Sequence, residues 1–196
     1  MNITHVKMIF LRRRMKKYKI IYADCPWRFG SRGIRAGKFQ HLEYPTMSVD
    51  EICALPIIDN VDDNAALFMW STSAHLMCIE RIMNAWGFRY VRIDAVWDKV
   101  TKSGARASCV GCWGMNDIEI LLMGTRGSIL HEQKVNNLSQ HVTAVRPGKH
   151  SGKPEIFRQR IEQRFPKMTP RLILFDRGSH EGWDSFGFEA TNSIKL

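Results

Sequence analysis

The sequence predicts an α/β fold, in which a mostly parallel sheet carries helices on both faces. Three observations predict it. Apolar runs typical of buried strands recur along the chain, stretches with helical spacing lie between some of them, and 44% of the 196 residues are hydrophobic, which is enough for a buried core. A chain of this length suits one compact domain, which we expect over residues 19–196 after a basic N-terminal arm over residues 1–18.

The expected strands are short apolar segments rich in β-branched and aromatic residues. In chain order they span residues 19–23, 65–70, 90–97, 118–123 and 171–175. Two helices are expected between them. The first covers residues 74–86, where apolar side chains recur at helical spacing, and the second follows Pro154, with its apolar side chains mostly on one side.

Two stretches are too long for simple connections. Residues 28–47 and 100–116 each carry several glycines and basic side chains, and long loops beside an α/β sheet often bind ligands. We expect nucleic-acid contacts from these loops. The candidate contacts are Arg28, Lys38, Lys102 and Arg106. A third polar stretch, residues 132–149, is expected to be a partly mobile link before the last helix.

The charge and cysteine content limit the function classes. Lys and Arg number 29 against 19 acidic residues, and the formal net charge of +10 favours a polyanionic partner such as nucleic acid. The five cysteines suit free thiols in a reducing interior better than a disulfide framework. No run reaches the ~20 apolar residues that span a bilayer, so we expect a cytoplasmic protein and no membrane partner. The basic cluster over residues 12–17 is either a phosphate-binding arm or a solvated terminus.

The sharpest local signal is the tetrapeptide Asp24-Cys25-Pro26-Trp27, which follows an apolar strand. Enzymes of the α/β class bind their ligands at the carboxyl ends of strands. Taken alone, however, such a tetrapeptide fits a strand followed by a turn, with Asp24 capping its own loop and Trp27 packed in the core. A functional interpretation therefore depends on the motifs that surround it.

The tetrapeptide resembles the Asp-Pro-Pro-Trp signature of amino-methyltransferases, and further motifs follow it in the order of one branch, the MT-A70 family. The matching segments are residues 44–52, 67–72, 86–90, 97–99, 119–127, 150–154 and 182–187. The resemblance covers about residues 19–189. It implies a Rossmann-like methyltransferase fold in which the catalytic tetrapeptide precedes the main cofactor-binding strand, here residues 171–176.

The resemblance also implies an S-adenosylmethionine-dependent enzyme that methylates the exocyclic N6 amine of adenine in DNA. Carried over by position, Asp24 and Lys153 contact the cofactor, with Lys153 neutralising the methionine carboxylate. By the same comparison Arg177 and His180 contact its nucleoside portion and Glu189 accepts the ribose hydroxyls. A substrate-side role is implied for Tyr44, although this side chain could equally pack on the core.

The tetrapeptide has a chemical rationale for this reaction. The adenine amine is a poor nucleophile because its lone pair is delocalised into the ring. The Asp24 carboxylate can accept one of its N–H bonds and the Cys25 carbonyl, held by Pro26, can accept the other, while Trp27 can stack on the base. No metal is required, because the sulfonium of the cofactor already makes the methyl group electrophilic.

Two positions depart from the family pattern. Cys25 replaces the usual first proline, which leaves the loop less rigid, and Phe188 stands where the family commonly carries asparagine, which removes a polar cofactor contact.

Cys109 and Cys112 have the spacing of half a zinc site, but no second pair follows, so we expect no metal. Residues 30–33 are glycine-rich without the pattern of a phosphate-binding loop. Trp113 either contacts substrate or folds onto its own loop.

Other functions fit the same residues. An RNA adenosine methyltransferase would use the same chemistry, since nothing in these residues reads the 2′-hydroxyl. A non-catalytic nucleic-acid-binding subunit of a methyltransferase complex is a second alternative, because Phe188 already departs from the pattern. Methylation of protein side-chain amides fits the charge less well. We expect DNA to be the substrate, because the chain is short and its motif pattern is closer to the bacterial and phage members of the family. The same likeness implies that the protein acts in a bacterial or phage-infected cell. The sequence is compatible with a monomer or a homodimer.

Overall fold

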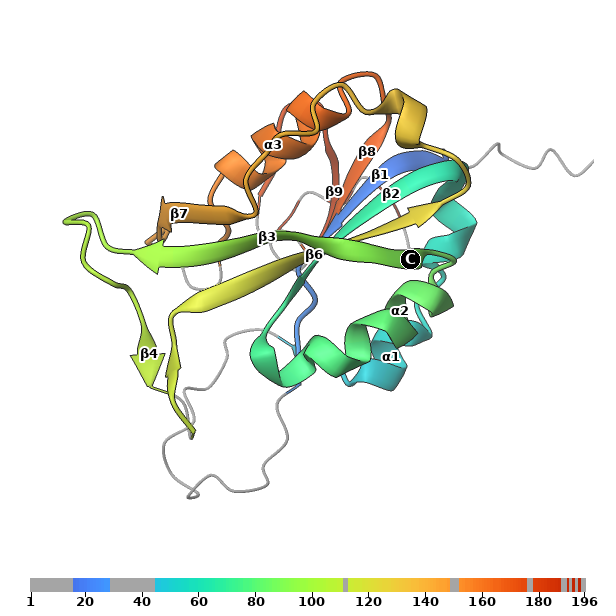
Figure 1. Ribbon diagram of the computed structural model, residues 1–196. Coiled ribbons are helices and arrows are strands. Elements are labelled where there is room, and N and C mark those ends of the chain that lie inside the picture. The colour runs from blue at the N-terminus through green and yellow to red at the C-terminus, as the bar shows by residue number, and fades with distance from the viewer. Residues whose placement is uncertain are drawn as a thin grey trace, which may run out of the picture.

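A computed structural model describes residues 16–28, 45–110, 113–148, 152–175 and 178–187, together with residues 190, 192 and 194. Within these residues the chain forms a seven-stranded sheet and a separate two-stranded hairpin (Figure 1). The strands are β1 (Tyr18–Ala23), β2 (Val61–Ser71), β3 (Arg89–Val100), β4 (Cys109–Val110), β5 (Met115–Asn116), β6 (Ile118–Arg126), β7 (His141–Val145), β8 (Arg171–Leu174) and β9 (Asp184–Phe186). The α-helices are α1 (Val49–Cys53), α2 (Ile79–Ala85) and α3 (Ile156–Arg164), and the 3-10 helices are η1 (Ile57–Asn60), η2 (Ser73–Cys78) and η3 (Leu130–Glu132).

The sheet has the strand order β7-β3-β6-β2-β1-β8-β9. Neighbouring strands run parallel except at β6, which is antiparallel to both β2 and β3. The prediction of a mostly parallel sheet is therefore confirmed. Because β6 is reversed, it begins at the edge of the sheet where its neighbours β2 and β3 end.

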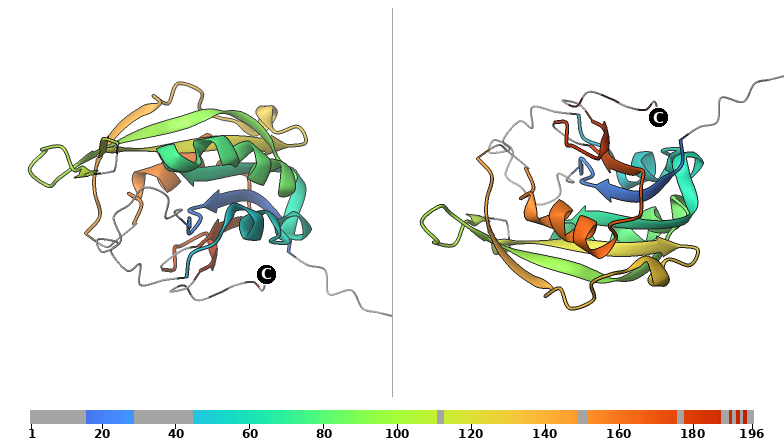
Figure 2. Two further views of the ribbon diagram at one scale, coloured as in Figure 1. Left: turned by 90° about the horizontal axis from the view of Figure 1, so that it is seen from below. Right: turned by 90° about the horizontal axis from the view of Figure 1, so that it is seen from above.

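Helices cover both faces of the sheet, as predicted (Figure 2). On one face, Ile52 of α1 and Ile82 of α2 join Ile21 of β1 in a buried cluster. On the other face, Phe157 of α3 packs in a second cluster with Ile20 of β1. Consecutive residues of β1 thus point into opposite cores, which explains why this strand is a continuous apolar run rather than an alternating one.

The five predicted strands are present as β1, β2, β3, β6 and β8. β1 begins at Tyr18, one residue earlier than expected; this side chain is buried and its hydroxyl donates to Asp184 Oδ2 at 2.6 Å. The predicted helix over residues 74–86 starts as the 3-10 helix η2 and continues as α2, and the predicted helix after Pro154 is α3.

The expectation of a partly mobile link over residues 132–149 is wrong. Residues 141–145 of this stretch form the edge strand β7, which pairs in parallel with β3. The indole Nε1–H of Trp97 on β3 donates to the carbonyl of Ala144 on β7 at 2.9 Å. Only Val142 is buried in β7, so the strand lacks the apolar run that would have revealed it.

Two absences hold for the part of the chain that the structure describes. No helix there is long and apolar enough to cross a membrane, and no three side chains of His, Cys, Asp or Glu gather in a group that could hold a metal ion. The thiol of Cys109 is exposed and lies 3.8 Å from the carbonyl oxygen of Asn116. Cys112, the other half of the Cys-x-x-Cys spacing, lies outside the described residues.

Candidate active site

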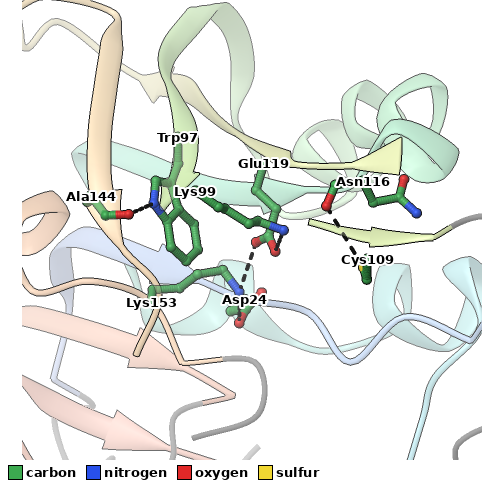
Figure 3. A network of polar contacts seen from close by, with 8 residues as sticks. All are labelled: Asp24, Trp97, Lys99, Cys109, Asn116, Glu119, Ala144 and Lys153. Atoms are coloured by element: carbon green, nitrogen blue, oxygen red, sulfur yellow. Dashed lines mark hydrogen bonds and ion pairs between the residues drawn. The ribbon is translucent and has the colours of Figure 1, made fainter. Parts of the chain in front are cut away.

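Four charged side chains meet at one edge of the sheet (Figure 3). Asp24 follows the last residue of β1, Lys99 lies near the end of β3, Glu119 is the second residue of β6, and Lys153 precedes α3. The reversed direction of β6 explains the meeting, because it brings the start of that strand to the edge where β1 and β3 end. This is the edge at which α/β enzymes bind their ligands.

The four charges alternate in sign along a line. The Lys153 ammonium lies 2.5 Å from Asp24 Oδ2 and 3.2 Å from Glu119 Oε2, and the Lys99 ammonium lies 2.8 Å from Glu119 Oε1. All four side chains are largely removed from solvent: their exposed fractions are 27% for Asp24, 10% for Lys153, 21% for Glu119 and 11% for Lys99. Two carboxylates and two ammonium groups balance each other, which lowers the free-energy cost of burying them.

The pKa values reflect this mutual support. Burial alone would lower the pKa of Lys153, but the charges of Asp24 and Glu119 outweigh it and hold that pKa above its ordinary value. Burial alone would raise the pKa of Glu119, but Lys153 and Lys99 hold it below its ordinary value. Both groups therefore stay charged at neutral pH, and the line of charges persists.

Aromatic side chains form the floor beneath the two lysines. The Lys153 ammonium lies 5.5 Å from the ring centroid of Trp70, and the Lys99 ammonium lies 5.5 Å from that of Trp97. Trp70 and Trp97 pack edge to face, with ring centroids 6.1 Å apart, and Trp70 Nε1–H donates to the Tyr22 hydroxyl at 2.7 Å. These fixed rings limit the positions that the lysine side chains can adopt.

The backbone of the tetrapeptide is held by a neighbouring segment. The Met47 N–H donates to the Pro26 carbonyl at 2.7 Å, and the Arg28 N–H donates to the Met47 carbonyl at 2.9 Å. The Trp27 N–H donates to the Cys25 carbonyl at 2.9 Å, which closes a tight turn over Pro26. A carbonyl oxygen has two lone pairs, so the Cys25 carbonyl retains the capacity to accept a second hydrogen bond.

Trp27 stacks on His75 of η2. The two ring centroids lie 4.7 Å apart with 17° between the planes, and Trp27 is only 6% exposed. Thr72 Oγ1 lies 3.0 Å from His75 Nδ1, and the imidazole also hydrogen-bonds the backbone of Arg28. Burial lowers the pKa of His75, which the bond to Arg28 only partly offsets, so the ring is neutral at neutral pH. His75 thus fixes the plane of the indole.

Cys25 is a structural residue in this arrangement. Its side chain is buried in the cluster beneath α1 and α2. Burial, together with the charge of Asp24, raises the pKa of the thiol well above its ordinary value. A protonated thiol is a weak nucleophile and a poor metal ligand, so what Cys25 offers the site is its backbone carbonyl.

The turn after β8, where the resemblance locates cofactor contacts, has an unusual backbone. Phe175 follows β8 directly and adopts a φ of 64°, a region that favours glycine. Its N–H donates to the Phe186 carbonyl at 2.5 Å, which ties the turn to β9. His180 lies farther along this connection, where its carbonyl accepts from the Trp183 N–H at 3.1 Å.

The structure brings together only some of the predicted site residues. Asp24 and Lys153 are in direct contact, although the sequence suggested no pairing between them. Arg28 is exposed and pairs with Glu51 at 3.0 Å. The exposed residues Lys102 and Arg106 lie on the excursion after β3, with Arg106 3.2 Å from Asp117. The predicted site residues Lys38, Tyr44, Arg177 and Glu189 lie outside the described residues.

Three site residues escaped the sequence analysis: Lys99, Glu119 and His75. The available signal for Glu119 was a carboxylate inside an apolar strand, where a charge is costly unless it is paired. Lys99 gave a similar signal at the end of the neighbouring strand. His75 falls within a predicted helix as an isolated polar residue, and nothing in the sequence connects it to Trp27.

A mostly parallel sheet with one reversed strand, helices on both faces and a charged cluster where β1 ends define a Rossmann-like methyltransferase domain. The chain belongs to the MT-A70 family, whose model matches residues 18–189. This match extends over almost the whole of the described domain, and the resemblance seen in the sequence is confirmed.

Two relatives are informative about the breadth of this family. The chain is 28% identical to the Type II methyltransferase M.MunI of a Mycoplasma species, over 96% of this chain and 84% of that protein. It is 27% identical to the human N(6)-adenosine-methyltransferase catalytic subunit METTL3, over 82% of this chain but only 26% of that protein. The chain thus spans more than four fifths of the first relative and about a quarter of the second.

Proposed function

We propose that this protein is an S-adenosylmethionine-dependent methyltransferase that modifies the N6 amine of adenine in DNA. The observation that carries the proposal is the pairing of Asp24 with Lys153 at the end of β1, within a methyltransferase domain. The Asp24 carboxylate, which Lys153 holds in place, and the neighbouring Cys25 carbonyl are suited to accept the two hydrogens of an amino group. The net charge of +10 suits a polyanionic substrate.

The residues present fit the cofactor. The methionine portion of S-adenosylmethionine carries a carboxylate and an ammonium, and the site offers the Lys153 cation and the Asp24 carboxylate side by side. The strained turn at Phe175 fits a position where backbone approaches a ligand closely. When bound, the cofactor supplies an electrophilic methyl group, and the protein supplies the position of the acceptor.

Lys153 changes partner in the mechanism that we propose. In the structure its ammonium is shared between Asp24 and Glu119. Lys153 would exchange Asp24 for the methionine carboxylate of the cofactor, and Glu119 would keep the ammonium charged and within the site. The Asp24 carboxylate, which has two oxygens, would then accept a hydrogen bond from the adenine amine.

Asp24 and Cys25 together orient the amine. The Asp24 carboxylate accepts one N–H, and the second lone pair of the Cys25 carbonyl accepts the other, which draws the nitrogen toward tetrahedral geometry. Trp27 lines the base pocket, and its stack on His75 keeps the indole plane fixed while the base enters. The base must leave its stack to reach this position, and aromatic contact offsets part of that cost.

A transfer assay with the full chain tests the proposal. Tritiated cofactor is incubated with a random-sequence DNA duplex and with an RNA of the same sequence composition, and the labelled nucleoside is identified after digestion. We expect N6-methyldeoxyadenosine from DNA, and a loss of ~100- to 1000-fold in Asp24→Asn, which keeps the size of the side chain. The matched control is Asp98→Asn, because Asp98 likewise lies near the carboxyl end of a strand, here β3, but its contact is a longer one with His141, at 3.7 Å. Label in another base, or equal transfer by Asp24→Asn, would refute the assignment.

RNA is the second candidate substrate, since the relative METTL3 bears the name of an adenosine methyltransferase. We favour DNA because the Type II methyltransferase M.MunI matches this chain over nearly its full length. By the same comparison we propose that the protein acts in the cytoplasm of a bacterial cell. Transfer to RNA with none to DNA would reverse this choice. Calorimetric titration with the cofactor tests the non-catalytic alternative, which predicts no binding.

A further inference from the structure

The chain leaves the sheet between β3 and β6 and returns to it beside the candidate active site. The Lys99 N–H donates to the Asp117 carbonyl at 3.0 Å, so the excursion starts and ends at one point. Its outer part carries the hairpin of β4 and β5, which pairs Cys109 with Asn116 and stands apart from the seven-stranded sheet (Figure 1). Figure 3 shows Cys109 and Asn116 beside the pair of Lys99 and Glu119.

The hairpin presents large apolar side chains to solvent. Trp113 is fully exposed, and Val110 and Met115 are 83% and 55% exposed. The other five tryptophans of the chain are all buried, at 7% exposure or less. Single exposed apolar residues are common, but three on one short hairpin form a patch that indicates an interaction site.

We propose that Trp113 stacks on a base of the DNA next to the target adenine, and this inference rests on the function proposed above. The flanking side chains suit a nucleic acid, because Lys102 and Arg106 are exposed on the same excursion. The reach is also suitable. Trp113 precedes Glu119 by six residues, and at ~3.3 Å per extended residue its backbone lies at most ~20 Å from the backbone of Glu119.

A base fits this patch better than a second protein does. A tryptophan side chain buries ~150–250 Å² on full contact, and a typical protein interface buries ~800 Å² on each partner. Three apolar side chains on one short hairpin are too few for such an interface, but one indole matches the size of one base. Apolar wedges of this kind fill the space that opens when bases are unstacked. Trp113 would thus stabilise the DNA once adenine has left the duplex.

Fluorescence quenching tests the contact directly. Because Trp113 is the exposed tryptophan, acrylamide added to the full chain should quench its emission selectively, and Trp113→Phe should remove the quenchable part. We expect a random-sequence DNA duplex to reduce quenching of the wild-type protein to the level of Trp113→Phe. Quenching that is unchanged by bound DNA overturns the inference. If Trp113 becomes protected from acrylamide as the protein concentration rises in the absence of DNA, the inference is also overturned, because a second copy of the chain then covers the indole.

Binding measurements separate stacking from folding. Trp113→Ala should weaken DNA binding by ~5- to 100-fold, whereas Trp113→Phe keeps an aromatic ring and should stay within ~3-fold of wild type. Leu130→Ala is the matched control, because Leu130 is also exposed but follows β6 at the opposite end. Cofactor affinity should be unchanged in all three variants. Wild-type DNA affinity in Trp113→Ala refutes the inference. Absence of methyl transfer refutes only the proposed function, because these measurements need no turnover.

Discussion

Glu119→Gln removes the charge at the centre of the active-site line while it keeps the shape of the side chain. At separations of 2.8 and 3.2 Å, each of the two ion pairs of Glu119 contributes an attraction of ~5 kcal/mol for an effective dielectric constant of ~20. Desolvation of the carboxylate offsets several kcal/mol of this attraction. The variant leaves two cations in place, and Lys99 loses its contact with a carboxylate. Removal of one partner from a fully buried ion pair typically costs ~3–5 kcal/mol. Because Glu119 is 21% exposed, we expect a smaller net loss, ~2–3 kcal/mol, in the free energy of unfolding.

This loss is measurable by thermal unfolding. For a chain of this size, 1 kcal/mol corresponds to ~2–4 °C in the midpoint, so Glu119→Gln should unfold ~5–10 °C below wild type. The matched control is Asp63→Asn, because Asp63 pairs with Arg126 at 3.4 Å but is 94% exposed. An exposed pair of this kind should leave the midpoint within ~2 °C of wild type. If both variants unfold at the same temperature, the charges at the sheet edge are not a buried network and the argument for Glu119 is wrong.

The pH dependence gives a second check on Glu119. Its pKa is lowered in the folded state, so its stabilising contribution is present above the unfolded pKa of ~4.3 and is lost as the pH falls through the folded pKa. The difference in stability between wild type and Glu119→Gln should therefore be largest at neutral pH and should shrink in acid. A difference that stays constant across that range would exclude the ion pairs as its source.

Three further predictions follow from the same geometry. Lys153→Met should weaken cofactor binding by ~10- to 100-fold, which is the effect of losing one charge-assisted hydrogen bond. Trp27→Ala should instead weaken DNA binding more than cofactor binding. Equal losses of both affinities in each variant would contradict these two roles. His75→Phe keeps the ring stack but cannot titrate. Because burial lowers the pKa of His75, the thermal-unfolding midpoint of the wild type should fall relative to that of His75→Phe as the pH falls from ~7 to ~5. If the two midpoints change with pH in parallel, His75 does not contribute to the pH dependence of stability. Nucleic-acid affinity should fall steeply with salt concentration, because Lys and Arg side chains that bind phosphates release counterions from the nucleic acid. Titrations at several ionic strengths measure this dependence. An affinity that does not change with salt would remove the electrostatic argument.

The sequence predicted the parts of the fold whose signal is local. Continuous apolar runs revealed the strands that are buried on both faces, such as β1, and helical spacing revealed α2 and α3. It missed β7, where a single buried residue gives no periodic pattern, and β9, which is three residues long. Edge strands depend on their neighbour for pairing, so little in their own side chains identifies them.

The site shows the same division between local and distant information. Asp24 and Lys153 could be named from motifs, but they are 129 residues apart and only the fold shows that they pair. Glu119 reaches the candidate active site because β6 runs against its neighbours, and the direction of a strand is not visible in an apolar run. Motifs therefore predicted the groups that would act on the ligands, and the structure added the groups that hold them.

The cysteine at position 25 illustrates how the fold replaces a local constraint. A proline stabilises a folded chain mainly by restricting the unfolded chain, so its absence should lower stability by ~0.4–1 kcal/mol without altering the folded turn. The turn itself is held from outside: Met47 binds the Pro26 carbonyl and the Arg28 N–H, and His75 holds the indole of Trp27. These contacts fix the residues on either side of the Cys25 carbonyl. The departure from the family signature therefore affects the stability of the protein more than the position of the carbonyl that would bind the amine.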